Sequence, residues 1–203
     1  MSKYVITIAR QFGSLGRPIA GRMAEILGIE YFDRDIVDAA AKKMKLPVSA
    51  ISDADETVSN GLFQMMFPLG QSGIRMQHDV FNTQREIILN IADKGNCIIV
   101  GRCADYILES VKNHLRIYIY ASYDQRLKNC VETLKMTEES ARRMIREVDK
   151  AREAYHRHYA GYAPEDVNYK DILIDSGMLG VEGTAQYLAE LVRERFGYKA
   201  DRF

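Results

Sequence analysis

The chain has 203 residues, of which 47% are hydrophobic and 28% are charged, a balance typical of one globular domain and not of a disordered chain. Lys plus Arg and Asp plus Glu both total 28, so overall charge supplies no attraction to nucleic acid or to an anionic membrane. The three cysteines form no CxxC pair, and no segment has the length of a membrane span or the pattern of a signal peptide. We therefore expect reduced cysteines, a cytoplasmic location, and neither nucleic acid nor membrane as a partner.

The first predicted elements are a strand, a glycine loop and a helix. Residues 4–9 (YVITIA) form a β-branched run that is typical of a buried parallel strand. Gly13 and Gly16 interrupt the loop that follows, and Pro18 is tolerated in the first turn of a helix. Gly28 is the expected C-terminal cap of that helix. This order is the first half of a βαβ unit.

A less regular segment comes next. Residues 29–32 predict a short strand, and Asp33 is expected to cap a helix that ends before Pro47. Residues 48–73 mix breakers and acidic residues with the apolar run 62–67 (LFQMMF), which indicates either a packed insertion or a self-association surface. A long helix is predicted over residues 74–94.

The second half of the chain alternates strands with helices. Strands are predicted over residues 97–101, 115–120 and 171–175, and helices over 123–135, 138–157 (capped by Thr137) and 181–196. Strands separated by helices predict an α/β fold with a parallel sheet and helices on both faces.

The loop after the first strand is a candidate anion site. Ligands of an open parallel sheet gather beyond the carboxyl ends of its strands. Gly13 and Gly16 allow backbone N–H groups to close around an anion at the positive end of the next helix, and Arg17 adds a cation with two donors. The alternative is a tight turn with a surface arginine. The buried strand before the loop and the helix after it favour phosphate binding.

Three segments of the chain resemble the cytidylate-kinase-like family, a branch of the P-loop nucleoside-monophosphate kinases. They are residues 6–20 with 27–33, residues 98–108 and residues 172–185, which follow one another in the family's order over nearly the whole chain. The resemblance implies a P-loop NTPase three-layer α/β/α fold with an acceptor-binding insertion and a helical lid. It also implies transfer of the terminal phosphoryl group of ATP, with Mg²⁺, to a nucleoside monophosphate, with CMP or dCMP the first acceptor to test. Residues 1–203 would form a single domain, with its core at about 1–47, 95–135 and 168–203, the insertion at about 48–94 and the lid at about 137–167.

The resemblance also implies roles for individual residues. The nucleotide-binding residues would be Gly13, Ser14, Leu15, Gly16 and Arg17; the catalytic cations would be Arg17, Arg146 and Arg152; the acceptor would be bound by Asp33, Arg102 and Asp149. Simpler interpretations stay open: a helix cap for Asp33, a surface ion pair for Arg102, and a solvated charged face for the helix that carries the other three. No residue is assigned to a metal; His156 and His158 lack further ligands and are expected to make ordinary packing and solvent contacts.

The loop departs from the usual phosphate-binding motif. In GxxxxGK[ST] a lysine reaches the β- and γ-phosphates and a hydroxyl reaches Mg²⁺, whereas here Gly16 stands at the lysine position and Pro18 lacks a hydroxyl. Either Arg17 supplies the charge and Ser14 or an acidic side chain holds the metal through water, or the loop binds phosphate without turnover. The second possibility corresponds to a non-catalytic nucleotide- or phosphate-binding regulatory or scaffold protein. A third hypothesis is a homodimer formed through residues 62–67.

Overall fold

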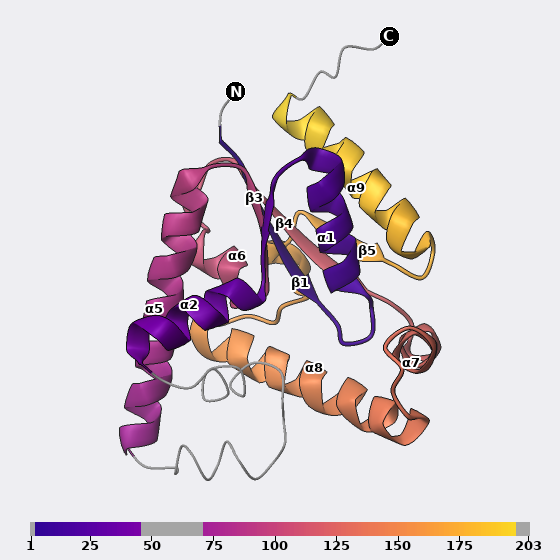
Figure 1. Cartoon of the computed structure of the whole chain (residues 1–203), viewed down its shortest axis with the longest axis horizontal. Helices are drawn as coiled ribbons and strands as arrows, with labels where there is room; N and C mark the ends of the chain where they lie inside the picture. Colours follow the sequence, from indigo (N-terminus) through magenta and orange to yellow (C-terminus); the bar gives the residue numbers. More distant parts are fainter. Residues whose placement is uncertain (1–2, 46–70, 198–203) are drawn as a thin grey trace.

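A computed structural model describes residues 3–45 and 71–197, with side chains from residue 77 onward in the second range. Five strands form one sheet in the order β2-β3-β1-β4-β5, and every neighbouring pair is parallel (Figure 1). The strands are β1 (Val5–Arg10), β2 (Glu30–Phe32), β3 (Cys97–Val100), β4 (His114–Tyr120) and β5 (Ile172–Asp175). Because all strands run the same way, their carboxyl ends meet at one edge of the sheet.

Helices cover both faces of the sheet (Figure 1). They are α1 (Gly16–Leu27), α2 (Arg34–Met44), α5 (Gln71–Lys94), α6 (Ala104–Ile107), α7 (Tyr123–Glu132), α8 (Glu138–Ala160) and α9 (Gly180–Phe196), with a 3₁₀ turn at Val167–Tyr169. Ile6 and Ile8 of β1 pack with α1 and α9, whereas Val5 packs with α2, α5 and α6. Successive strand residues thus serve opposite layers. The predicted three-layer α/β/α architecture is confirmed.

The helix caps follow the sequence prediction at most positions. Gly28 ends α1 with a φ of 65°, and the Thr137 side chain accepts a hydrogen bond from the N–H of Ser140 at the start of α8. Asp33 does precede α2, but its side chain makes no capping hydrogen bond. The cap prediction is therefore wrong for this carboxylate, which instead contacts Arg17 and Tyr31.

The predicted and observed boundaries differ where local geometry overrides periodicity. Helix α7 ends at Glu132, three residues before the predicted end, and Lys135 has a φ of 58°, which an α-helix does not accommodate. Helix α6 was not predicted, since four residues are too few to show a helical period. Residues 46–70, which include the apolar run 62–67, lie outside the described residues.

Helix α8 crosses the carboxyl edge of the sheet, next to the loop between β1 and α1 (Figure 1). Two contacts connect it to that loop: the Asp149 carboxylate accepts the N–H of Phe12 at 2.7 Å, and the Arg152 guanidinium donates to the carbonyl of Arg10 at 3.1 Å. The sheet edge, the loop and this helix therefore surround one region. Within residues 3–45 and 71–197, no helix is both long and apolar enough to span a membrane.

Candidate functional site

The loop between β1 and α1 is held in a shape that requires its two glycines. Gly13 has a φ of 78°, and a Cβ there would lie 2.9 Å from the carbonyl oxygen of Arg126 and from the Sγ of Cys130. Gly16 begins α1, and a Cβ there would lie 2.8 Å from the Cβ of Arg10. Contacts this short force a neighbour to shift, so α7 and Arg10 can pack against the loop only because both side chains are missing.

The other predicted loop residues differ in what they present. The Ser14 side chain is buried, and its hydroxyl donates to the backbone carbonyl of Gln11 at 2.9 Å. The backbone carbonyl of Ser14 accepts from the Ser176 hydroxyl at 2.7 Å. Ser14 thus ties the loop together internally. Leu15 and Arg17 line a hollow beside the first turn of α1, together with both glycines. The first N–H groups of a helix have no partner within it, so this hollow adjoins backbone donors suited to an anion.

Asp33 joins the loop to the end of β2. Its buried carboxylate forms an ion pair with Arg17 and lies 3.8 Å from the Arg10 guanidinium. The Tyr31 hydroxyl donates to the same carboxylate at 3.3 Å. Burial, followed by the negative charge of Asp33, raises the pKa of Tyr31 to about 12, so the phenol stays protonated near neutral pH. One carboxylate thereby contacts the two arginines that flank the loop, Arg10 at the end of β1 and Arg17 in α1.

A sharp turn after β3 places Arg102 at the carboxyl edge. Gly101, Arg102 and Cys103 have φ values of 76°, 60° and 51°, three left-handed residues in succession. Arg102 is only 5% exposed, which excludes the surface ion pair considered above. It lines a cavity that also receives Arg10, Arg152 and Asp105. The prediction that Arg102 lies at the sheet edge is confirmed; what it binds there stays a prediction.

The predicted residues of α8 separate into two groups. Asp149 forms an ion pair with Arg126 besides accepting the N–H of Phe12, so it fastens α7 and the loop to α8. Arg152 reaches the loop from the next turn and lines the cavities on both sides of it. Arg146 is exposed and lines none of the three cavities at this edge. The structure therefore brings Arg152 into the site and leaves Arg146 outside it.

Sequence reasoning missed Arg10 and Arg126. Arg10 is the last residue of β1 and lines all three cavities of this region. The available signal was its place directly after the strand predicted over residues 4–9, similar to the signal that identified Arg102. Arg126 donates to the carbonyl of Phe12 and pairs with Asp149, contacts that link residues far apart in the chain and that no local pattern reveals.

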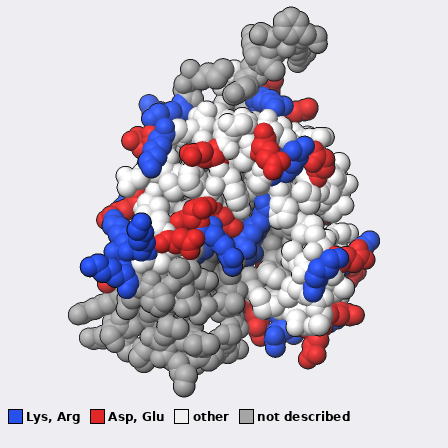
Figure 2. Space-filling model, viewed as in Figure 1, with Lys and Arg blue, Asp and Glu red and all other residues white. Residues whose placement is uncertain are grey.

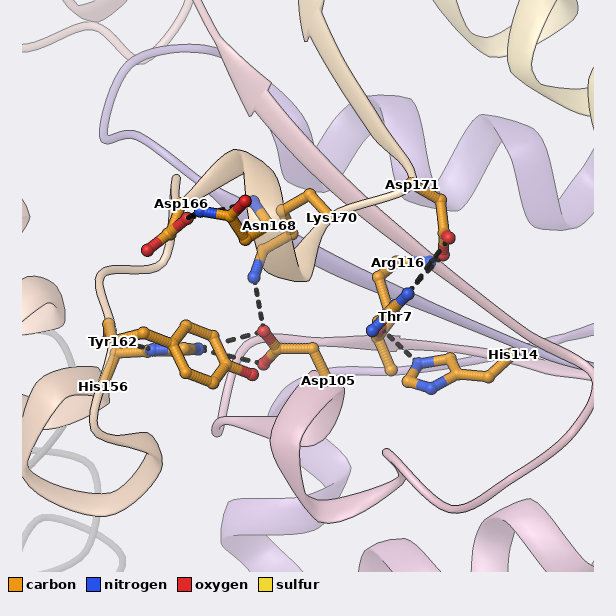
Figure 3. Close-up of polar contacts among 10 residues, drawn as sticks. All are labelled: Thr7, Asp105, His114, Arg116, His156, Tyr162, Asp166, Asn168, Lys170 and Asp171. Atoms are coloured by element: carbon orange, nitrogen blue, oxygen red, sulfur yellow. Dashed lines mark hydrogen bonds and ion pairs between the residues drawn. The ribbon is translucent and has the colours of Figure 1, made fainter.

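Asp105, His156 and Lys170 form a buried ionic cluster (Figure 3). Asp105 and His156 also line the Arg102 cavity. Asp105 accepts from the Lys170 ammonium at 2.6 Å and from His156 Nε2 at 3.0 Å, while His156 Nδ1 lies 2.9 Å from the carbonyl of Tyr162. Both ring nitrogens thus lie within hydrogen-bonding distance of an oxygen atom. His156 is 4% exposed, so the expectation of solvent contact is wrong for this residue, because Asp105 holds it inside the fold. His158 is exposed, as expected.

The charge of Asp105 is maintained by its neighbours. Burial alone would raise the pKa of this carboxyl, but the hydrogen bond from His156 and the positive charges of His156 and Lys170 hold it well below its usual range. The cluster connects three parts of the fold: His156 is in α8, Asp105 is in α6, and Lys170 lies two residues before β5. It therefore fixes the C-terminal part of α8 against the sheet edge.

The surface around the site carries charges of both signs. Figure 2 shows Lys and Arg side chains gathered with Asp and Glu side chains over the described part of this face, with no large single-sign area. This agrees with the zero net charge of the chain. Inside the site, by contrast, three arginines line one cavity: Arg10, Arg102 and Arg152.

The comparisons with known proteins agree with this architecture. The chain resembles the crystal structure of an uncharacterized protein from Eubacterium ventriosum, with a TM-score of 0.73 and 25% sequence identity. The match covers 95% of this chain and 99% of that protein's chain. It also matches a gluconokinase from Sinorhizobium meliloti (TM-score 0.52, 11% identity, 98% of each chain) and a shikimate kinase from Acinetobacter baumannii in complex with shikimate (TM-score 0.51, 14% identity, 98% of this chain and 97% of that one). These two likenesses show the P-loop kinase fold alone. No curated protein matches the chain. The model of the cytidylate kinase-like family matches residues 5–178, and the chain therefore belongs to that family.

Proposed function

We propose that this protein transfers the terminal phosphoryl group of ATP to a small anionic acceptor, with CMP or dCMP as the first candidates. The observation that carries the proposal is the convergence of three arginines, Arg10, Arg102 and Arg152, in one cavity at the carboxyl edge of the sheet, beside a glycine loop at a helix start. Phosphoryl transfer needs mainly positioning and neutralisation of charge, which such an arrangement supplies. Family membership supports the same reaction class.

In this proposal the hollow of the loop and the Arg102 cavity each receive one partner. The loop residues Gly13, Leu15, Gly16 and Arg17 face the phosphates of ATP, and Arg102 binds the acceptor's phosphate. The bond from the γ-phosphorus to the β–γ bridging oxygen breaks as a bond to an acceptor phosphate oxygen forms. ADP keeps the bridging oxygen, and no proton has to move because the attacking phosphate oxygen is already ionised.

The ordinary protein ligands of Mg²⁺ do not fit this loop. Pro18 has no hydroxyl, and the Ser14 hydroxyl is buried and donates to the carbonyl of Gln11. Among the residues that the structure describes, no three His, Cys, Asp or Glu side chains gather as a metal site. Mg²⁺ is commonly bound through substrate phosphates with few protein ligands, so an ion carried by ATP is compatible with this chain.

The test is a phosphoryl-transfer assay on the purified chain with ATP and Mg²⁺. The acceptor panel contains CMP, dCMP, UMP and AMP, with shikimate and gluconate added because the fold is shared with kinases of those compounds. We expect turnover with one acceptor, and Arg102→Ala should lower kcat/KM by roughly 30-fold or more, the usual effect of removing a buried charged partner. Arg22→Ala is the control, since Arg22 is exposed on α1 and pairs with Glu182 away from the site. No product with any acceptor would refute the proposal.

The glycine at the lysine position and the engaged Ser14 hydroxyl favour a second candidate, a nucleotide- or phosphate-binding protein without turnover. It predicts that ATP binds, as measured by calorimetry, while no acceptor gives product.

A further inference from the structure

The side chain of Arg10 crosses the loop between two glycines. A Cβ added at Gly16 would lie 2.8 Å from the Cβ of Arg10 and 3.1 Å from its Cγ. A Cβ added at Gly101 would lie 2.5 Å from the Nη1 of Arg10. Gly16 begins α1 and Gly101 follows β3, so the side chain extends from the phosphate loop toward Arg102. Gly16 leaves room for the stem of Arg10, and the φ of 76° at Gly101 favours glycine beside its guanidinium.

Gly16 also stands at the position of the lysine in the usual phosphate loop. Any side chain there would collide with the stem of Arg10, at 2.8 Å for the first carbon alone. The packing of Arg10 beside the loop therefore requires that no lysine stand at position 16. The start of α1 has no lysine at position 16, but the Arg10 side chain brings a cation to the same region from the end of β1.

Arg10 is better placed than Arg17 for the terminal phosphate. The side chain of Arg10 is 6% exposed and that of Arg17 is 35% exposed, although both pair with Asp33. Arg10 lines the cavity that contains Arg102 and also the hollow of the loop, whereas Arg17 lines only the hollow among the three cavities. A buried cation is less screened by water and acts more strongly on a developing charge.

We propose that Arg10 replaces the phosphate-loop lysine. In this assignment its guanidinium binds the terminal phosphate of the nucleoside triphosphate and neutralises it as the phosphoryl group moves toward the Arg102 side. Arg10 keeps its proton throughout, since an arginine remains charged in proteins. Asp33 holds the side chain in position. The inference rests on the proposed function for the transfer step, but its binding part can be tested without turnover.

The experiment compares AMP, ADP and ATP as ligands, each with Mg²⁺, by calorimetry on the wild type and on Arg10→Met, Arg10→Lys and Arg17→Met. A cation at the terminal phosphate affects ATP selectively, whereas a general collapse of the loop weakens all three nucleotides. We expect Arg10→Met to lower ATP affinity by about 10- to 100-fold and AMP affinity by less than about threefold, the range of a charge-assisted hydrogen bond. Arg10→Lys should keep most of the preference for ATP, and Arg17→Met should lower it less than Arg10→Met.

A second variant protects the test if Arg10→Met does not fold. Gly16→Ala suits a helical position but places a carbon against the Arg10 stem, so it should also lower ATP affinity selectively. Equal losses for AMP and ATP in Arg10→Met, a larger loss in Arg17→Met, or an unchanged ATP affinity in Gly16→Ala would each overturn the assignment.

The two proposals fail in different ways. Wild-type binding of ATP with a selective loss in Arg10→Met, but without product from any acceptor, would refute the kinase and keep the assignment of Arg10. Turnover that survives in Arg10→Met with an unchanged KM for ATP would refute the assignment and keep the kinase. A wild type that does not bind ATP would refute both.

Discussion

Replacing Asp105 by asparagine removes the charge of the buried cluster and keeps its size. The carboxylate accepts from Lys170, whose side chain is fully buried, and from His156, whose side chain is 5% exposed. An asparagine keeps one of the two carboxylate oxygens and replaces the other with an NH₂ group, so Lys170 and His156 lose the charged acceptor that they share. The buried Lys170 ammonium would remain without its anion.

The magnitude follows from this burial. Breaking a buried ion pair by removing one partner costs about 3–5 kcal/mol in the free energy of unfolding. For a chain of this length each kcal/mol corresponds to about 2–4 °C in Tm, so we expect a fall of roughly 6–20 °C in Asp105→Asn. Because the cluster fixes the C-terminal part of α8, the variant should also lose activity through Arg152 on the same helix.

The assay is urea unfolding followed by circular dichroism, with Asp171→Asn as the matched control. Asp171 pairs with Arg116 at 3.1 Å, but these side chains are 17% and 32% exposed (Figure 3). Water reaches this pair more readily than the cluster, so the control should lose less stability than Asp105→Asn. A loss below about 1 kcal/mol in Asp105→Asn, or equal losses in the two variants, would refute the reasoning.

The effect of Asp105→Asn also depends on pH with a defined sign. The pKa of Asp105 is held below its unfolded value of about 3.9, so its contribution is complete above that pH and is lost as pH falls through and below it. The difference in stability between wild type and variant should therefore shrink as the pH falls below about 4.

Three further predictions test separate parts of the structure. Burial, and then the charge of Arg116, lowers the pKa of His114 to about 4. The free energy of unfolding should therefore fall by about 2 kcal/mol from pH 7 to 5, because the unfolded chain takes up a proton there, and urea titrations of His114→Gln should show a smaller fall. Gly13→Ala should lower the free energy of unfolding by roughly 2–4 kcal/mol through its φ of 78° and its contact with α7, whereas Gly21→Ala, which meets no atom within 4 Å in helix α1, should raise it by about 1 kcal/mol. Arg152→Ala should lower kcat about tenfold or more, the effect of losing one charge-assisted hydrogen bond, whereas Arg146→Ala should change kcat less than about threefold. Equal losses in the two variants would mean that α8 moves and brings Arg146 to the phosphates.

Local pattern was enough to predict much of the fold. The apolar β-branched run before Gly13 and the alternation of strands with helices identify a parallel sheet covered on both faces. The left-handed Gly28 and the cap at Thr137 were also readable, because caps depend on residues within one turn of each other. Arg102 was placed correctly because a residue that follows a buried strand must emerge at the sheet edge.

The tertiary structure decided which charged residues meet. Asp105 contacts His156 and Lys170 across 51 and 65 residues of chain, and Asp149 reaches Phe12 across 137 residues. Such pairs are selected by the packing of separate elements, and no periodicity within one element encodes them. The phosphate loop shows the division most clearly: its glycines could be read from the sequence as an anion site, but only the fold revealed that Gly16 makes room for Arg10, because that contact joins the end of a strand to the start of a helix.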